Sequence, residues 1–441
     1  MGTVNIGIIG LGTVGGGVVK LINSHHDDYV AKYDIDLAII KACSRDQAEA
    51  ERLGLDQGVF TPDWREVCTD PNIDIVIEVI GGEHPATEIF ETAFANGKHV
   101  ISANKALLGR HVEHLASLAA QNGVQLRCEA AAAGGIPVVH AIEHDLMGNE
   151  ILTIAGIMNG TTNYILSRMR NEGLGFEEVL KAAQEAGYAE ADPTADVDGF
   201  DAASKIAILS SIGFKTRITT DDVYMQGIRN ISATDIQMAD SFGYIIKLLA
   251  IARKTSEGID VRVHPTMIPK NHSLANVDGA MNAVYVVGDA VGETMFYGAG
   301  AGSFPTASAV LGDVMALAES IAKGERPIAE NEPFARTEPI CPISDHTTRF
   351  YVRLKVQDRL GTLAACTNVF AECGISISHI SQRETEPEEG VCTLVYLTHD
   401  TKEEAMQHAQ EALASMDSVA EVASIIRIED ISLWTEGVFQ N

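Results

Sequence analysis

The chain has 441 residues, 46% of them hydrophobic, which is enough for about three domains with their own cores at ~150 residues each. Its 32 Lys and Arg residues against 61 Asp and Glu residues give a formal net charge of −29, which repels the phosphates of nucleic acids and anionic membranes. The seven cysteines lack metal-ligand spacing and no apolar run approaches the ~20 residues of a membrane helix, so we expect a cytoplasmic protein without nucleic-acid or membrane partners.

The chain begins with a predicted strand, a glycine-rich loop and a helix. Residues 4–9 form a short apolar run, residues 10–15 read Gly-Leu-Gly-Thr-Val-Gly, and residues 18–22 have helical character. Glycines in this context let the backbone approach a pyrophosphate at the helix N-terminus. The pattern therefore predicts dinucleotide binding, against the alternative of a glycine-rich structural turn.

The end of the next predicted strand, residues 35–42, bears on the choice of cofactor. An acid at this point binds the ribose 2′-hydroxyl of NAD, whereas an arginine accommodates the 2′-phosphate of NADP. Arg45 therefore favours NADP, and Asp46 leaves NAD open.

Strands and helices continue to alternate through the first third of the chain. This alternation predicts a parallel, doubly wound sheet whose ligand crevice lies at the carboxyl ends of the strands. Ser102 and Lys105 follow such an end, so Lys105 either faces the nicotinamide and substrate or is an ordinary surface lysine. The predicted elements are strands at 73–80, 99–102 and 124–128 and helices at 83–96 and 112–122.

Residues 129–137 combine one carboxylate, Glu129, with small residues and two glycines. Exposed backbone carbonyls beside a carboxylate make an oxygen-rich site of the kind that hard cations prefer. The simpler interpretation is a tight turn that leaves the nucleotide domain.

A mixed second domain is predicted from residue 151 onward. A strand at 151–159 precedes a helix at 164–170, and Thr161, Thr162 or Asn163 serves as the helix N-cap or reaches a polar substrate. Further segments at 223–227, 245–253, 261–264 and 283–287 resemble strands and helices. Residues 297–306 predict a flexible glycine turn before a helix at 307–322.

The strongest candidate for chemistry is the acidic loop, residues 187–201, together with the helix that follows it. The loop contains Glu190, Asp192, Asp196, Asp198 and Asp201, and Lys205 lies one helical turn after Asp201. Desolvation lowers the pKa of a lysine and neighbouring carboxylates raise it, so Lys205 is a candidate proton donor. The alternative is a solvated loop with an ordinary surface ion pair.

The last quarter of the chain predicts a separate module after a linker at 328–345. Its pattern is βαββαβ, of ferredoxin type, and it resembles the ACT domain, a regulatory module that binds amino acids. Leu360 stands where that family commonly has proline. We expect threonine or a related end product to bind here and inhibit; the alternative is a dimerisation module without an effector.

Over essentially its full length the chain resembles homoserine dehydrogenase, with six motifs in the same order. They lie at residues 10–15, 102–105, 129–137, 159–163, 187–205 and 298–306. The resemblance implies interconversion of L-homoserine and L-aspartate 4-semialdehyde with a nicotinamide cofactor, on the route to threonine, methionine and isoleucine.

The resemblance also implies roles for individual residues. Lys205 corresponds to the proton donor, Lys105 to a second lysine near the reacting oxygen, and Glu190 to the carboxylate that holds the substrate amino group. Asp196 and Asp201 match further acidic residues of the site. The expected cofactor contacts are Gly10, Leu11, Gly12, Thr13, Val14, Gly15, Arg45, Ser102, Lys105 and Gly302.

The family likewise implies a sodium site, formed by Glu129 and the carbonyls of Ala132, Gly134 and Ile136. A homodimer or homotetramer is expected. No aspartokinase segment precedes the glycine loop, so we expect the single-function form.

The expected fold is α/β: an N-terminal Rossmann-type doubly wound sheet, a mixed α+β catalytic domain and a C-terminal ferredoxin-like ACT domain. The predicted boundaries are 1–133 for the nucleotide domain, 134–306 for the catalytic and dimerisation domain, 307–327 for a helix that returns to the nucleotide domain, 328–346 for the linker and 347–430 for the ACT domain.

Two other functions compete with this one. The chain could be a related nicotinamide oxidoreductase with another small substrate, against which the segment 190–205 argues. It could instead be a non-catalytic amino-acid sensor that keeps cofactor binding. Lys105, Glu190, Asp201 and Lys205 argue against a sensor, which has no need of them together.

Overall fold

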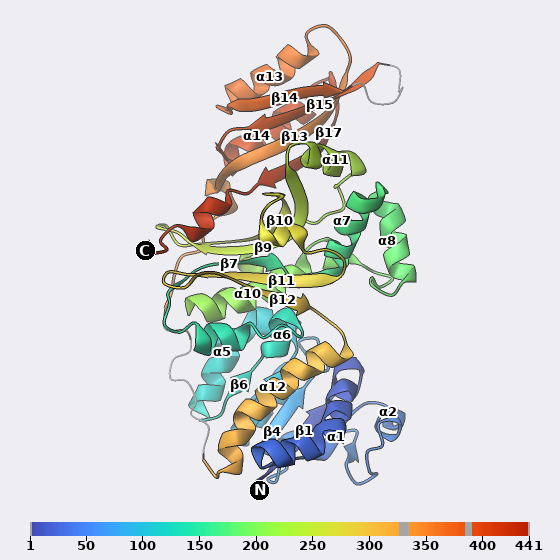
Figure 1. The fold of residues 1–441 in the computed structure, drawn as a ribbon, viewed down its shortest axis with the longest axis vertical. Coiled ribbons are helices and arrows are strands. Elements are labelled where there is room, and N and C mark those ends of the chain that lie inside the picture. The colour runs from blue at the N-terminus through green and yellow to red at the C-terminus, as the bar shows by residue number, and fades with distance from the viewer. Residues whose placement is uncertain (1, 326–333, 335, 384–389, 440–441) are drawn as a thin grey trace. The chain divides into compact units, whose positions relative to one another are not determined.

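The computed structural model describes residues 2–325, 334, 336–383 and 390–439, and its chain divides into two compact units (Figure 1). Unit 1 consists of Met1–Ile154, Ala203–Val223 and Met281–Glu338. Unit 2 consists of Ala155–Ala202, Tyr224–Ala280 and Pro339–Asn441. Among the helices in the described part of the chain, none combines the length and apolar character needed to span a bilayer.

Unit 1 contains a six-stranded parallel sheet in the order β3-β2-β1-β4-β5-β6. Because the chain runs outward from β1 in one direction and then from β4 in the other, the sheet is doubly wound and switches direction between β1 and β4. The predicted Rossmann-type sheet is confirmed. The strands are β1 (Gly2–Ile9), β2 (Ile35–Cys43), β3 (Phe60–Thr61), β4 (Ile75–Glu78), β5 (His99–Ser102) and β6 (Leu126–Arg127).

Helices cover this sheet, and one of them comes from far along the chain. Val310 and Leu317 of α12 (Ser303–Ala322) are buried in the same hydrophobic core as Ile6 and Ile8 of β1. This core also contains Val18 of α1. The remaining helices are α1 (Thr13–Tyr33), α2 (Gln47–Arg52), α3 (Trp64–Thr69), α4 (Ala86–Ala95) and α5 (Lys105–Gln121).

Three sequence-based predictions for unit 1 were wrong in detail. The helix expected at 112–122 begins at Lys105, because the Asn104 side chain caps it by accepting a 3.2 Å hydrogen bond from the Leu107 amide. The tight turn expected at 129–137 opens with a helix, α6 (Glu129–Ala133). The flexible turn expected at 297–306 is largely ordered structure, because β12 (Gly292–Ala299) pairs with β11 (Met281–Gly288) and α12 follows at once.

Unit 2 is organised around a long antiparallel hairpin. Its strands β9 (Tyr244–Lys254) and β10 (Ile259–Pro269) pair along their full length, and β8 (Tyr224–Met225) adds to β10 in parallel. The unit also contains α7 (Gly160–Glu172), α8 (Phe176–Glu185), α9 (Thr194–Val197) and α11 (Ala233–Ser241). The chain passes between the units within β7 (Ile151–Ile157) and within α10 (Phe200–Phe214).

The C-terminal part of unit 2 has the predicted βαββαβ order. Its antiparallel sheet runs β17-β13-β15-β14, and α13 and α14 pack against it (Figure 1). Leu360, in place of the usual proline, is fully exposed. Residues 328–333 and 335 of the predicted linker at 328–345 lie outside the described residues. The elements are β13 (Thr347–Gln357), α13 (Thr362–Glu372), β14 (Ile377–Arg383), β15 (Val391–Thr398), α14 (Glu403–Ala414) and β17 (Val419–Ile428).

The C-terminal module continues into the hairpin of unit 2 through parallel pairing of β10 and β17. A buried ion pair reinforces this junction, since Arg262 donates hydrogen bonds of 2.8 and 3.0 Å to the Glu429 carboxylate. The indole of Trp434 donates 2.9 Å to the same carboxylate and is 1% exposed. The tail after β17, for which the sequence indicates no role, therefore closes this junction.

Candidate active site

The glycine loop has the geometry that a dinucleotide requires. A β carbon on Gly15 would lie 1.9 Å from the carbonyl oxygen of Gly10, so glycine is required there for close packing of helix on strand. A β carbon on Gly12 would meet nothing within 4 Å, and Gly12 and Thr13 are exposed where α1 begins. The loop therefore offers open backbone and a helix N-terminus to a pyrophosphate. Leu11 is buried beneath it and Val14 is half-buried.

The start of α12 lies directly against this loop. Ser303 donates a 2.6 Å hydrogen bond to the carbonyl of Thr13, and a β carbon on Gly17 would lie 2.8 Å from the Ser303 carbonyl oxygen. Gly302, a predicted cofactor contact, is the N-cap of α12. Unit 1 therefore brings two predicted cofactor segments together from opposite ends of its sequence.

Arg45 and Asp46, which bear on the choice of cofactor, are both exposed after β2. Asp46 caps α2 by accepting a 3.0 Å hydrogen bond from the amide of Ala48. Arg45 is exposed at the end of the strand. Asp46 therefore has a structural role at the start of α2.

Ser102 is buried and holds the strand end rather than facing outward. Its hydroxyl donates 2.7 Å to Glu78 and accepts 2.9 Å from the Asn104 amide. Burial raises the pKa of Glu78, while hydrogen bonds from Ser102 and Ile80 lower it. This network fixes the turn into α5, whose first residue is the exposed Lys105.

The helices that carry the two candidate lysines touch. A β carbon on Gly109 of α5 would lie 3.1 Å from the α carbon of Ser204 in α10. Lys105 lies one turn before Gly109, and Lys205 adjoins Ser204. Lys205 is 6% exposed and therefore buried, whereas Lys105 is exposed.

The structure separates the five acids of the acidic loop by role. Hydrogen bonds from Thr194 lower the pKa of the Asp192 carboxyl, which accepts 3.1 Å from the Thr194 amide. Asp198 forms an ion pair with Arg229 at 2.6 Å. These two acids stabilise the loop itself, and Glu190, Asp196 and Asp201 are left as candidates for binding.

Asn159 joins two of these candidates. Its amide nitrogen donates 2.6 Å to Asp196 and 2.9 Å to Asp201, while its oxygen accepts 2.8 Å from the amide of Thr162. Asn159 is therefore the N-cap of α7, and the expectation that residue 161, 162 or 163 caps this helix was wrong. An Asn immediately before a helix that starts with Gly160 is a capping signal, but its contacts 37 and 42 residues away have no local signature.

The segment that leads to Glu190 is held by α7 and α8. Thr161 donates 2.7 Å to the carbonyl of Tyr188, whose ring stacks on Tyr164 with centroids 4.6 Å apart. Gln184 donates 3.0 Å to the backbone carbonyl of Glu190. These contacts leave the Glu190 side chain exposed on an anchored backbone.

A buried lysine that the sequence analysis did not single out braces α7. Lys247 of β9 donates 3.0 Å to Asn163 and 2.6 Å to the carbonyl of Val277, and it pairs with Asp278 at 3.2 Å. It is 1% exposed, and burial lowers its pKa to about 8. With this bracing, Asn163 is committed to packing α7 against β9.

Glu129 is buried and accepts hydrogen bonds from three successive backbone amides. Val138 and Val139 donate 2.7 and 2.9 Å to one oxygen, and His140 donates 2.7 Å to the other. The three amides that bind the carboxylate begin two residues after Ile136, one of the residues predicted to supply a carbonyl. Ala132, Gly134 and Ile136 are buried. Within the described chain no group of three or more His, Cys, Asp or Glu side chains could hold a metal.

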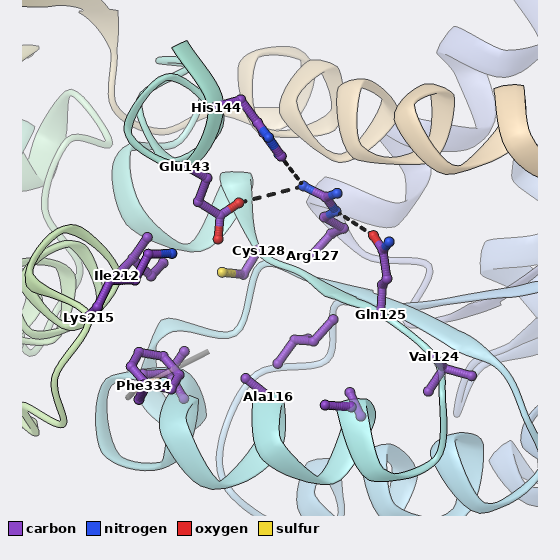
Figure 2. A pocket seen from close by; sticks show the side chains of 14 residues that line it. Ala116, Val124, Gln125, Arg127, Cys128, Glu143, His144, Ile212, Lys215 and Phe334 are labelled. Atoms are coloured by element: carbon purple, nitrogen blue, oxygen red, sulfur yellow. Dashed lines mark hydrogen bonds and ion pairs between the residues drawn. The ribbon is translucent and has the colours of Figure 1, made fainter. Parts of the chain in front are cut away.

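A pocket of about 150 Å³ in unit 1 contains none of the predicted site residues. Figure 2 shows Arg127 pointing toward Gln125, Glu143 and His144 within it, at 3.0, 3.5 and 3.1 Å. The cation therefore already has partners inside the protein. The candidate residues are instead those of the glycine loop and the two lysines in unit 1, and those of the acidic loop in unit 2.

Family models match three consecutive stretches of the chain. The model described as the NAD binding domain of homoserine dehydrogenase matches residues 10–129, the model for homoserine dehydrogenase matches residues 137–315, and the ACT domain model matches residues 350–416.

Full-length relatives agree. Homoserine dehydrogenase from Synechocystis sp. is 43% identical, with 97% of this chain and 99% of the relative covered. The relative from Corynebacterium glutamicum is 42% identical, with 97% and 96% covered.

Solved structures of the same family share the fold. The homoserine dehydrogenase from Thiobacillus denitrificans has a TM-score of 0.90 at 42% identity and covers 97% of this chain and 99% of its own. A hyperthermophilic archaeal homoserine dehydrogenase in complex with NADPH has a TM-score of 0.63 at 25% identity, with 74% and 100% covered. The chain belongs to the homoserine dehydrogenase family, and it is an NAD(P)-dependent oxidoreductase with an ACT domain.

Proposed function

We propose that Lys205 is the proton donor when L-aspartate 4-semialdehyde is reduced to L-homoserine, and the acceptor in reverse. Hydride transfer to the aldehyde carbon develops negative charge on oxygen, and an ammonium group within reach stabilises that charge and delivers the proton. The nicotinamide supplies the hydride when it is bound. Burial of Lys205, one helical turn after Asp201, supports the role because a desolvated ammonium interacts strongly with a developing anion.

The observation that carries the proposal is that the acids of the loop have different hydrogen-bond and ion-pair partners. Asp192 and Asp198 are committed to the loop, whereas Asp196 and Asp201 converge on Asn159. We assign Glu190 and Asp196 to the substrate ammonium, and Asp201 to the catalytic group beside Lys205. Lys105 is assigned as the second lysine near the reacting oxygen.

A matched pair of variants tests this assignment. Asp201→Asn is expected to lower kcat/KM for L-homoserine oxidation by about 10²-fold, the lower end of the range for a positioned acid–base group. Asp192→Asn, in the same loop, is expected to stay within about twofold of wild type. Absorbance of the reduced nicotinamide measures the activity of both variants. Equal losses of kcat/KM in the two would overturn the assignment of different roles to Asp201 and Asp192.

We assign NADP as the preferred cofactor, on the exposed position of Arg45 after β2. The archaeal relative in complex with NADPH supports the same choice. Arg45→Ala is expected to raise KM for NADP at least about tenfold and to leave KM for NAD unchanged, because the lost hydrogen bonds are to a charged group. An equal change in both constants would remove the basis for the preference.

We also propose that sodium binds beside Glu129 with the carbonyls of Ala132, Gly134 and Ile136, and stabilises the fold. The residues present fit such a cation in chemistry, since a buried carboxylate and backbone carbonyls are hard oxygen donors. The three amides fix the carboxylate and leave one of its about four lone-pair sites, on Oε2, for a further ligand. Thermal unfolding in sodium chloride against choline chloride at equal ionic strength tests this; equal midpoints would contradict it.

The ACT domain is assigned a feedback role with threonine as effector, and the chain is assigned to a homodimer or homotetramer. Inhibition of homoserine oxidation by L-threonine tests the first assignment, and mass measurement in solution tests the second. Seven reduced cysteines, five of them buried, fit a reducing compartment such as the cytoplasm. The domain boundaries 1–133, 134–306, 307–327, 328–346 and 347–430 remain part of the proposal.

A further inference from the structure

We propose that Glu78 is a positioning residue for the nicotinamide half of the cofactor. Glu78 is the last residue of β4 and is 0% exposed. Its carboxylate holds two segments in place, the loop 79–82 and the turn 102–105. The inference needs only the NAD(P) dependence of the chain, and it does not rest on the roles assigned to Lys205 or Arg45.

The carboxyl ends of three neighbouring strands meet at Glu78. Ile9 of β1 pairs with Glu78 of β4, and Glu78 pairs with Ser102 of β5. The sheet changes direction between β1 and β4, and a dinucleotide crosses a doubly wound sheet at such a point. Because the adenosine ribose is bound at the end of β2, on one side of the crossing, the nicotinamide half lies on the other side, at the ends of β4 and β5.

Hydrogen-bond donors from both of these strand ends converge on the Glu78 carboxylate. Its Oε1 accepts 2.9 Å from the amide of Ile80, and its Oε2 accepts 2.7 Å from the hydroxyl of Ser102. Burial raises the pKa of Glu78, and these hydrogen bonds, with further ones from Gly81 and Asn104, lower it. Since hydrogen bonds to an ionised group are stronger than those between neutral groups, the carboxylate fixes the loop after β4 and the turn after β5.

Two further contacts connect the segments that follow the strands. The side-chain nitrogen of Asn104 donates 2.7 Å to the carbonyl of Gly82 and so joins the turn to the loop. A β carbon on Gly10 would lie 2.9 Å from the carbonyl oxygen of Val79, so the glycine loop packs closely on the same loop. A displacement of loop 79–82 is therefore felt by the segments after β1 and β5.

The loop leaves room for a ligand. Gly81 and Gly82 have φ of 73° and 75°, which glycine adopts without strain, and a β carbon on either would meet no atom within 4 Å. Ile80 is 40% exposed, and its Cγ2 would lie 3.0 Å from a β carbon on Gly10, so it offers an apolar surface beside the glycine loop. Loss of the Glu78 charge is expected to loosen this end of the cofactor site and to leave the adenosine end intact.

The experiment uses the full chain and compares whole cofactors with fragments that lack the nicotinamide nucleotide. Dissociation constants are measured for NADPH and NADH, and for adenosine 2′,5′-bisphosphate and ADP, so that the comparison holds for either cofactor. Glu78→Gln keeps the shape of the side chain. Whichever way its amide is turned, it presents N–H groups to one set of the donors that Glu78 binds.

Glu78→Gln is expected to raise the Kd of the reduced cofactor and to lower kcat for L-homoserine oxidation, each at least about tenfold. The Kd of the fragment is expected to stay within about twofold of wild type, which a general loss of structure would not allow. If Glu78→Gln does not fold, Ser102→Ala removes one donor from the same carboxylate and is expected to show the same pattern.

Asp74→Asn is the matched control. Asp74 lies at the other end of β4 and accepts 2.8 Å from the amide of Asn5, so this variant also removes a charged acceptor, but at the opposite edge of the sheet. It is expected to keep kcat and all dissociation constants within about twofold of wild type. Equal losses for cofactor and fragment in Glu78→Gln, or losses as large in Asp74→Asn, would reduce Glu78 to a structural residue and overturn the proposal. Unchanged cofactor binding and kcat in Glu78→Gln would overturn it as well.

Discussion

The side-chain amide nitrogen of Asn159 lies 2.9 Å from Oδ2 of Asp201 and joins the cap of α7 to the first turn of α10. The same nitrogen donates to Asp196, and the amide oxygen accepts from Thr162. One buried side chain therefore sets both a helix terminus and the spacing of two carboxylates. Asn159 is a positioning residue, since it acts through the two acids.

Asn159→Ala is expected to lower kcat/KM for homoserine by about tenfold to a hundredfold, since hydrogen bonds to charged groups contribute about 1.5–3 kcal/mol. The variant also loses a helix cap, at about 1 kcal/mol of unfolding free energy. Asn171→Ala, exposed on the same helix, serves as control and is expected to match wild type. Steady-state kinetics and denaturant unfolding separate the two effects. An unfolding loss without a kinetic loss would show that Asn159 is only a cap.

Gly109→Ala is expected to separate α5 from α10. The added β carbon would lie 2.7 Å from the Thr220 hydroxyl and 3.1 Å from Ser204, so we expect a loss of about 1–3 kcal/mol by overpacking and a fall in kcat. Gly312→Ala, in α12 with nothing within 4 Å, is expected to gain about 0.5–1 kcal/mol. Thermal unfolding of both variants checks the opposite signs. A stabilised Gly109→Ala would contradict the close contact.

Gly12→Ala is expected to fold normally and bind the cofactor poorly. Its new methyl group meets no protein atom within 4 Å, and it occupies the space that the glycine loop leaves for the pyrophosphate. We expect the Kd for NADPH, followed by fluorescence, to rise at least about tenfold, a loss of about 1.4 kcal/mol. Gly58→Ala, equally open but outside the loop, is the control. Unchanged affinity in Gly12→Ala would remove the loop from the cofactor site.

Lys247→Met is expected to destabilise unit 2 by roughly 1–3 kcal/mol, because Asn163 and the Val277 carbonyl lose a buried donor, while Asp278 keeps its ion pair with Arg170. Burial lowers the pKa of Lys247 to about 8, below its unfolded value of 10.5. Between these values the unfolded state binds more protons, so the contribution of Lys247 is present above pH 10.5 and is lost as pH falls through 8.

The stability difference between wild type and Lys247→Met should therefore grow by about 3 kcal/mol from pH 8 to pH 10.5, at 1.36 kcal/mol per pKa unit. Urea unfolding at both pH values measures it. A difference that stays constant would show that Lys247 is not desolvated.

Much of the fold follows from local pattern. The glycine loop and the ACT elements were predictable because the hydrophobic periods of strands and helices, and the residues typical of turns, can be recognised within about 10 to 20 residues. The helix at Glu129–Ala133 was not predicted, because the two glycines after it indicate a turn. Its four alanines are the strongest helix formers and favour the helix that the structure has. The pairing of Tyr297 with Ala283 in β12 and β11 was missed because cross-strand partners have no local signature.

The candidate site was predicted less completely. The sequence places Glu190, Asp196, Asp201 and Lys205 in one segment, but it does not distinguish them from Asp192 and Asp198. Asp192 is held locally by Thr194, two residues away, but the roles of Asp196, Asp198 and Asp201 depend on Asn159 and Arg229, which reach the loop from 31 to 42 residues away. Contacts at such separations are set by tertiary packing, so neither composition nor spacing along the chain predicts them.

The most direct test of the role of Lys205 is kcat for L-homoserine oxidation by Lys205→Ala, with the Kd for NADPH measured on the same preparation. We expect a fall in kcat of about 10²–10⁴-fold, the range for a positioned acid–base group, with cofactor affinity retained. Lys181→Ala, exposed on α8, is the control and is expected to match wild type. If Lys205→Ala keeps wild-type kcat while it binds cofactor normally, the buried lysine is structural and the proton comes from another group.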